Sequence, residues 1–196
     1  MLDFSIYKRH HELARKTVHI TFAVLFSATY YFVGKELTAI FALIVGLLLL
    51  TSHAQKIFKL IHQYLSVLYD VGRRSWGEVY YAFGISASAL ITGSIGEFIT
   101  VIAIIAFADS AASLIGKAIT SPSLKFYDAK ASIAGSTAFF VVTIIILMLS
   151  KYVGIHAIEL NSLLATCLLL AGIEAVSPYG SDNFFVPLVG AFVLFL

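Results

Sequence analysis

Residues 98–117 read FITVIAIIAFADSAASLIGK. The first ten are apolar apart from Thr100, and Asp109 then appears with no loop-forming residue directly beside it. In a helix, Asp109, Ser113 and Lys117 are spaced by four residues, so they share one face over about 12 Å. An ionisable side chain inside a membrane span is costly and usually faces a partner, an ion or a watery cavity. We therefore expect this face to line a functional site.

The composition of the whole chain indicates a polytopic, all-α membrane protein. Of the 196 residues, 60% are hydrophobic and only 12% are charged, and the mean hydropathy is +0.94. A soluble domain of this length would carry more charge on its surface. The connections between apolar stretches are too short to fold separately, so residues 1–196 are predicted to form one membrane-embedded domain. The one cysteine, Cys167, excludes a disulfide within a single chain.

Seven apolar segments are predicted to form transmembrane helices. They cover residues 18–34, 37–51, 79–93, 98–117, 133–150, 162–176 and 184–196. Several are shorter than the roughly 20 residues that an untilted span prefers, and residues 184–196 are the shortest, so whether they cross fully stays open. The first segment is expected to be retained rather than cleaved, because no small-residue cleavage site closes it.

The placement of Lys and Arg predicts the orientation. Eleven of the 13 basic residues fall on one side if the spans alternate, and only Lys35 and Lys151 fall on the other. The positive-inside rule then predicts a cytoplasmic N-terminus. Between the second and third segments, residues 53–71 carry apolar side chains at helical spacing. This pattern predicts an amphipathic helix, either in the cytoplasmic interface or packed against the bundle.

Dense polar clusters gather on the predicted cytoplasmic side. They are Arg15-Lys16-Thr17-Val18-His19, Arg73 to Glu78, Asp109 to Lys117, Lys125 to Ser136, and Glu174 to Asn183. Each has a plain structural explanation, such as a topological anchor, a lipid headgroup contact, a helix start or a helix cap. Asp109 and Glu174 fit such explanations least. Two carboxylates with many cations on one side suggest a site for divalent metal and phosphate, although the common soluble nucleotide motifs are absent.

Taken in order, these clusters resemble the CTP-dependent lipid-alcohol kinases, the group of dolichol kinase, phytol kinase and yeast-type diacylglycerol kinase. The resemblance extends over residues 15 to 187. It implies transfer of the γ-phosphoryl of CTP to the hydroxyl of a membrane lipid at the cytoplasmic face, with Mg²⁺ present. An isoprenoid alcohol such as a polyprenol, dolichol or phytol is favoured over diacylglycerol. A prokaryotic plasma membrane is the expected location, no nucleic-acid partner is expected, and the oligomeric state stays open, a homodimer included.

The resemblance also implies roles for individual residues. Asp109 and Asp182 would hold Mg²⁺, with Asn183 and Glu174 nearby, and Asp109, Glu78 and His19 are candidates for the catalytic base. The nucleotide phosphates would be bound by Arg15, Lys16, Arg73, Arg74, Lys117, Lys125, Lys130, Ser132, Gly135 and Ser136. One position departs from the family pattern, because Ala134 stands where the family often has Glu.

Two other functions remain open. A CTP-dependent phospholipid cytidylyltransferase would have the same partners, but its usual Asp-rich C-terminal signature is not found. A small transporter would use Asp109 and Glu174 as an intramembrane relay. Two observations argue against a transporter. No polar cluster marks the outer half of the predicted bundle, where an exit path would run, and the sequence has no inverted repeat.

Overall fold

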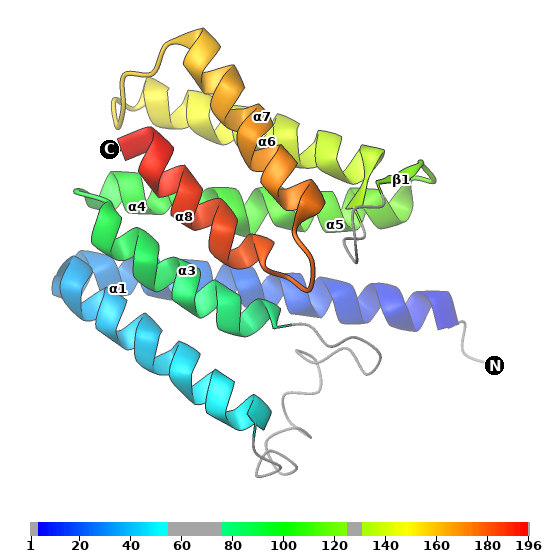
Figure 1. Ribbon diagram of the computed structural model, residues 1–196, viewed down its shortest axis with the longest axis horizontal. Coiled ribbons are helices and arrows are strands. Elements are labelled where there is room, and N and C mark those ends of the chain that lie inside the picture. Colours follow the sequence, from blue (N-terminus) through cyan, green and yellow to red (C-terminus); the bar gives the residue numbers. More distant parts are fainter. Residues whose placement is uncertain (1–3, 55–75, 125–130, 196) are drawn as a thin grey trace.

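A rod of three consecutive helices forms the centre of the fold. The computed structural model describes residues 4–54, 76–124 and 131–195. The rod consists of α4 (Ile95–Ala103), a π turn η2 (Ile104–Ala108) and α5 (Asp109–Ala118). It runs through the middle of the molecule in Figure 1. Of its most apolar 18-residue stretch 61% is buried, compared with 22% in α1 and 33% in α6, so the other helices surround it.

The helices around the rod begin with α1 (Phe4–Ala54), which consists of two arms. Gly34 has φ 83° and ψ 176°, a conformation that breaks the helix and that glycine adopts without strain. The chain reverses direction there (Figure 1). Then follow α3 (Gly77–Ile91), α6 (Ile133–Tyr152), α7 (Leu160–Val176) and α8 (Asp182–Phe195). Each of the seven apolar segments predicted from the sequence therefore lies largely within helix.

Local side-chain chemistry explains several helix starts. Ser94 accepts a hydrogen bond from the Glu97 amide, while the Glu97 carboxylate accepts one from the Gly93 amide at 2.7 Å. This reciprocal pairing is close to a capping box. Ser132 caps α6 in the same way by accepting from the Gly135 amide at 3.2 Å. Strands β1 (Ser123–Leu124) and β2 (Ala131–Ser132) form a small antiparallel pair just before α6, an addition to the all-α prediction.

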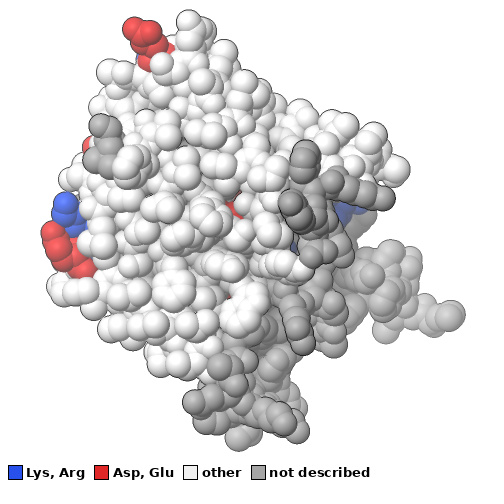
Figure 2. Space-filling model, in the orientation of Figure 1, with Lys and Arg blue, Asp and Glu red and all other residues white. Residues whose placement is uncertain are grey.

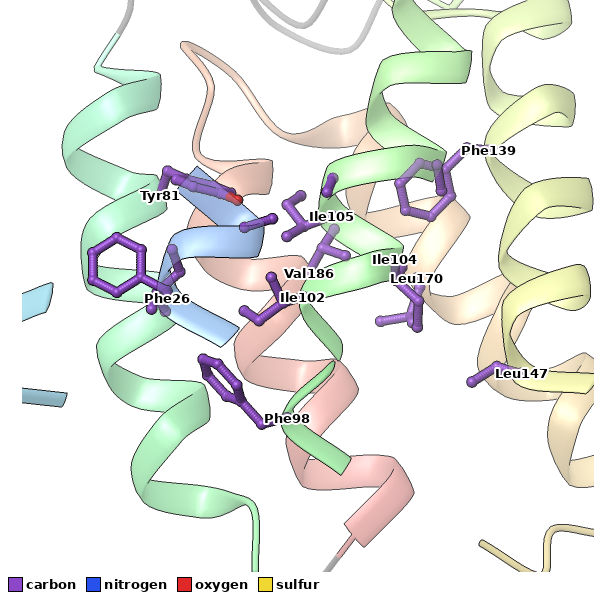
Figure 3. Close-up of a cluster of buried hydrophobic side chains, with 14 of the residues drawn as sticks. Phe26, Tyr81, Phe98, Ile102, Ile104, Ile105, Phe139, Leu147, Leu170 and Val186 are labelled. Atoms are coloured by element: carbon purple, nitrogen blue, oxygen red, sulfur yellow. The ribbon is translucent and has the colours of Figure 1, made fainter. Parts of the chain in front are cut away.

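The hydrophobic core is formed where the surrounding helices meet the rod. Figure 3 shows Phe98, Ile104 and Ile105 of the rod packed among side chains from α1, α3, α6, α7 and α8. Large apolar side chains are also exposed, mainly along α1, α6 and α7. In the part of the chain that the structure describes, three helices are long and apolar enough to cross a membrane: Leu13–Thr51, Ile95–Ala118 and Ile133–Tyr152. The count of seven spans and their orientation stay predictions.

The closest helix contacts involve glycines. A Cβ atom on Gly84 of α3 would lie 2.4 Å from the Asn183 carbonyl oxygen of α8, so no larger residue fits without movement. Pro187 lies within α8 and has no N–H to donate to that carbonyl four residues earlier. Between α5 and α6, a Cβ atom on Gly135 would lie 2.9 Å from the Ala112 carbonyl oxygen. These contacts hold the helix ends that carry the polar clusters close together.

The predicted amphipathic helix at residues 53–71 lies almost wholly outside the described residues. His53 and Ala54 end α1, and the structure describes nothing from residue 55 to residue 75. The interfacial helix therefore stays a prediction.

Candidate functional site

A buried ion pair joins α1 to α5. The Nζ atom of Lys16 donates a hydrogen bond to Oδ2 of Asp109. Only 4% of Lys16 and 8% of Asp109 is exposed. Two charges removed from water require close pairing to offset their lost hydration. Asp109 thus faces a charged partner inside the bundle, and that partner is a lysine that the resemblance had assigned to the nucleotide. That this face lines a functional site stays a prediction.

The π turn η2 ends immediately before Asp109. Its five residues, Ile104–Ala108, are followed directly by the first residue of α5. Within this region the Ser110 hydroxyl donates a hydrogen bond to the Ala106 carbonyl. π-helices are rare and occur mostly as single turns inside α-helices, frequently at functional sites. The wide turn is thus an independent reason to place a functional site at Asp109.

His19 and Tyr81 lie beside the ion pair. His19 follows Lys16 by three residues, is buried, and stacks on the Tyr81 ring with centroids 4.5 Å apart. The Tyr81 hydroxyl donates to the His19 carbonyl at 3.1 Å. This contact fixes the turn of α1 that carries both Lys16 and His19 against α3. The sequence prediction gave Tyr81 no role, although Tyr81 belongs to the pattern Gly77-Glu78-x-Tyr80-Tyr81 that contributes to the resemblance.

Two more carboxylates lie within electrostatic reach of this pair. Glu174, near the end of α7, accepts a hydrogen bond from the Ser136 hydroxyl of α6 at 3.1 Å. Asp182 is the first residue of α8. Lys16 acts electrostatically on the carboxylates of Asp109, Glu174 and Asp182. We call these four residues, from four different helices, the Asp109 cluster.

The turn before α8 adds oxygen atoms that have no partner. Tyr179 and Gly180 have positive φ angles of 56° and 84°, which reverse the chain between α7 and α8. The next residues, Ser181 and Asn183, are buried. Within the described part of the chain, neither Oγ of Ser181 nor Oδ1 of Asn183 has a hydrogen-bond partner. Leaving buried polar atoms unpaired costs about 1–3 kcal/mol each, so such atoms indicate a ligand or an ordered water.

The start of α3 lies against the same turn. The Trp76 amide donates to the Tyr179 carbonyl at 3.2 Å. Glu78 follows in the first turn of α3, where it is half-buried, and Arg15 of α1 acts on its carboxylate electrostatically. Glu78 and Arg15 therefore form the edge of the site, outside the buried ion pair.

Three predicted phosphate-binding residues have structural tasks at the start of α6. Ser132 caps the helix, and Gly135 allows the close contact with α5. Ser136 uses its hydroxyl to hold Glu174. Lys117 lies at the exposed last turn of α5, two helical turns beyond Asp109. The remaining four predicted cations lie outside the described residues: Arg73, Arg74, Lys125 and Lys130.

The predicted metal ligands partly come together. Asp109, Asp182 and Glu174 interact electrostatically, and Asn183 adjoins Asp182 in sequence. Among the residues that the structure describes, no three His, Cys, Asp or Glu side chains gather closely enough to hold a metal ion by themselves. The oxygen-only donors suit Mg²⁺, which is usually held by one or two carboxylates together with waters and substrate phosphates.

The face of the molecule drawn in Figure 2 carries few charges. Among the described residues it consists almost wholly of uncharged side chains, with a few acidic atoms visible near its middle and charged groups at its edges.

Comparisons with known proteins identify no relative. The chain matches no protein-family model, no curated protein and no solved structure. A function for this chain therefore rests on its own side chains and on the way the fold places them.

Proposed function

We propose that the chain is a membrane-embedded phosphotransferase that uses CTP to phosphorylate a lipid alcohol. The observation that carries the proposal is the Asp109 cluster, in which four helices bring three carboxylates and one buried lysine together in an apolar bundle. Phosphoryl transfer depends mainly on positioning and charge neutralisation, with little covalent work by the protein. A buried cluster of mixed charge beside lipid-facing helices supplies both requirements.

Individual residues divide the work in this proposal. Asp182 and the unpartnered Oδ1 of Asn183 would hold Mg²⁺ with Asp109 or Glu174, and the ion would neutralise phosphate charge. Lys16 compensates the carboxylates, and Lys117 is placed at the exposed end of α5 to meet a triphosphate. Glu78, His19 and Asp109 remain the candidates for accepting the proton of the lipid hydroxyl.

The lipid tail would lie against the apolar surface of the bundle. The exposed apolar residues of α1 and α6 face outward and offer contact to an isoprenoid or acyl chain. Its hydroxyl would have to enter the polar centre from the side, so that water and lipid meet at one place. This arrangement favours a long apolar alcohol over a soluble one.

The test is an assay on the purified chain. With CTP, Mg²⁺ and a panel of polyprenol, phytol, dolichol and diacylglycerol, one lipid should be converted to its phosphate while CDP is released. A parallel reaction contains phosphatidic acid, whose phosphate oxygen can attack the α-phosphorus of CTP. Formation of a CDP-lipid there, with release of pyrophosphate, would instead identify a cytidylyltransferase. Turnover that needs ATP and ignores CTP would remove the nucleotide assignment.

A variant pair tests the site itself. Asp109→Asn should reduce turnover at least about 1,000-fold, since a charge at the reacting centre is worth several kcal/mol. Glu97→Gln is the matched control, because Glu97 caps α4 away from the Asp109 cluster and an amide oxygen can still accept from Gly93. Near-native turnover in Asp109→Asn, with folding intact, would disprove the site assignment.

A further inference from the structure

A second candidate site lies at the other end of α7 and α8. A cavity of about 480 Å³ is lined by the start of α7, the end of α8 and the connection between α6 and α7. Thr166 lines it from α7, while Val193 and Leu194 line it from α8. Along α7 the wall extends from Ser162 to Leu169, and it ends five residues, about 7.5 Å of helix rise, before Glu174 of the Asp109 cluster. The cavity is therefore separate from the proposed reaction centre.

His156 gives this cavity its polar character. His156 as a whole is half-buried, but both of its ring nitrogens are buried, and in the described part of the chain no other residue forms a hydrogen bond with either. The Phe195 ring lies 5.9 Å from the imidazole, centroid to centroid, at an angle of 58°. A neutral imidazole has one N–H donor and one acceptor nitrogen, and leaving both unpaired is unfavourable. The position calls for a ligand with hydrogen-bonding groups.

The rest of the lining excludes a charged ligand. No Lys, Arg, Asp or Glu lines the cavity among the described residues. Lys151, in the last turn of α6, donates its hydrogen bond to the Ile158 carbonyl. Burial first, and the Lys151 charge second, lower the pKa of His156, which favours the neutral ring at pH 7. A phosphate group in this cavity would lose its hydration without gaining a cationic partner, so its binding would be unfavourable.

The walls next to His156 favour an aliphatic chain. Ile158, Leu169, Val193 and Leu194 present alkyl surface, and the Thr166 hydroxyl already donates to the Ser162 carbonyl at 2.9 Å. A ligand that is apolar along its length and carries a hydroxyl at one end would satisfy the imidazole and cover these side chains together. The bundle exposes many apolar residues, so its natural surroundings supply such molecules.

We propose that this cavity binds a neutral lipid that carries a hydroxyl group, with the hydroxyl hydrogen-bonded to His156 and the chain against α7 and α8. The site is independent of the proposed phosphotransferase activity and requires neither nucleotide nor metal.

The experiment compares three probes on the purified full chain in detergent, by native mass spectrometry. Monoolein is neutral and hydroxylated, methyl oleate is neutral without a hydroxyl, and oleoyl lysophosphatidic acid is anionic. Monoolein should bind about tenfold more tightly than either of the others, a factor that corresponds to one or two neutral hydrogen bonds. Equal binding of methyl oleate, or preference for the anionic lipid, would overturn the proposal.

Variants locate the binding. His156→Leu should weaken monoolein binding about tenfold and leave methyl oleate unchanged, while Ala165→Trp should block both by filling the cavity. Tyr152→Leu is the control, because Tyr152 is an exposed aromatic residue at the same end that does not line the cavity.

A measurement on the unmodified protein guards against a folding defect in the variants. The ¹⁵N resonances of the His156 ring should shift as monoolein is added and stay in place with methyl oleate. Unshifted His156 resonances at saturating monoolein, or unchanged binding by His156→Leu, would contradict the assignment of the imidazole.

Discussion

Replacing Lys16 with Met should destabilise the fold more than replacing its partner Asp109 with Asn. Lys16 is hydrogen-bonded to Asp109, whereas Arg15 and His19 act on Asp109 electrostatically, so the Lys16→Met change removes the direct partner and leaves Asp109, Glu174 and Asp182 to repel one another. Removing one member of a buried ion pair costs about 3–5 kcal/mol, because the other charge stays buried without compensation. We expect Lys16→Met to fall within that range.

Asp109→Asn should cost less, since Lys16 keeps two carboxylates within electrostatic reach and the Asn oxygen still accepts its hydrogen bond. The double variant Lys16→Met with Asp109→Asn should cost at least about 2 kcal/mol less than the sum of the two single changes. The free energy of unfolding is measured by titrating SDS into mixed micelles and following helix content by circular dichroism.

Lys35→Met provides the control for loss of a lysine from the same helix. Lys35 lies at the turn of α1, away from the Asp109 cluster, and its replacement should change the free energy of unfolding by less than about 0.5 kcal/mol. An average substitution changes the free energy of unfolding by about 1 kcal/mol. If the free energy of unfolding of Lys16→Met differs from that of the unaltered chain by no more than this, the Lys16–Asp109 ion pair does not hold α1 to α5. Additive costs in the double variant would lead to the same conclusion.

Three further results are expected. Gly84→Ala should lower the free energy of unfolding by about 1–3 kcal/mol, because the added Cβ would meet the Asn183 carbonyl oxygen. Gly172→Ala adds a Cβ with nothing within 4 Å and should leave stability unchanged or raise it. Thermal unfolding measures both effects. The pKa of His156 in the folded protein lies below its ordinary 6.5, so the neutral ring contributes fully to stability above pH 6.5. This contribution declines as the pH falls through the pKa of the folded state. The decline should be absent in His156→Leu when the free energy of unfolding is measured from pH 4 to 8. Lys117→Ala should raise the CTP concentration needed for half-maximal turnover, and unchanged kinetics would leave Lys117 a topological residue.

The helices could be predicted from sequence because hydropathy is a local property. Each apolar segment lies largely within a helix, and α3 begins at Gly77 and α8 at Asp182, inside two polar clusters for which a helix start or cap was one plain explanation. The break at Gly34 could also be read locally, since the two predicted segments meet beside it. The number of spans and their direction depend on the membrane, which the fold alone does not test.

The partners inside the site could be predicted only in part. Asp109 was expected to face a partner, but choosing Lys16 required knowing which turn of α1 meets α5. A serine and a glycine at positions 132 and 135 are equally suited to binding a phosphate and to capping or packing a helix. The sequence pattern therefore did not distinguish the two roles of Ser132 and Gly135. Neither the π turn nor the stacking of His19 on Tyr81 leaves a periodic signal, because both arise from packing between helices.

The π turn before Asp109 makes the site depend on chain length as well as on side chains. A π turn holds one residue more than the α-helical turn it replaces. Deleting one residue between Ile104 and Ala108 would restore uniform α-helix and rotate the whole of α5 by about 100° about its axis. Asp109 would then leave Lys16, and the close contact of Gly135 with the Ala112 carbonyl would be lost in the same movement. The turn thus acts as a one-residue insertion that sets the rotational phase of α5, and hence which of its side chains reach the interior.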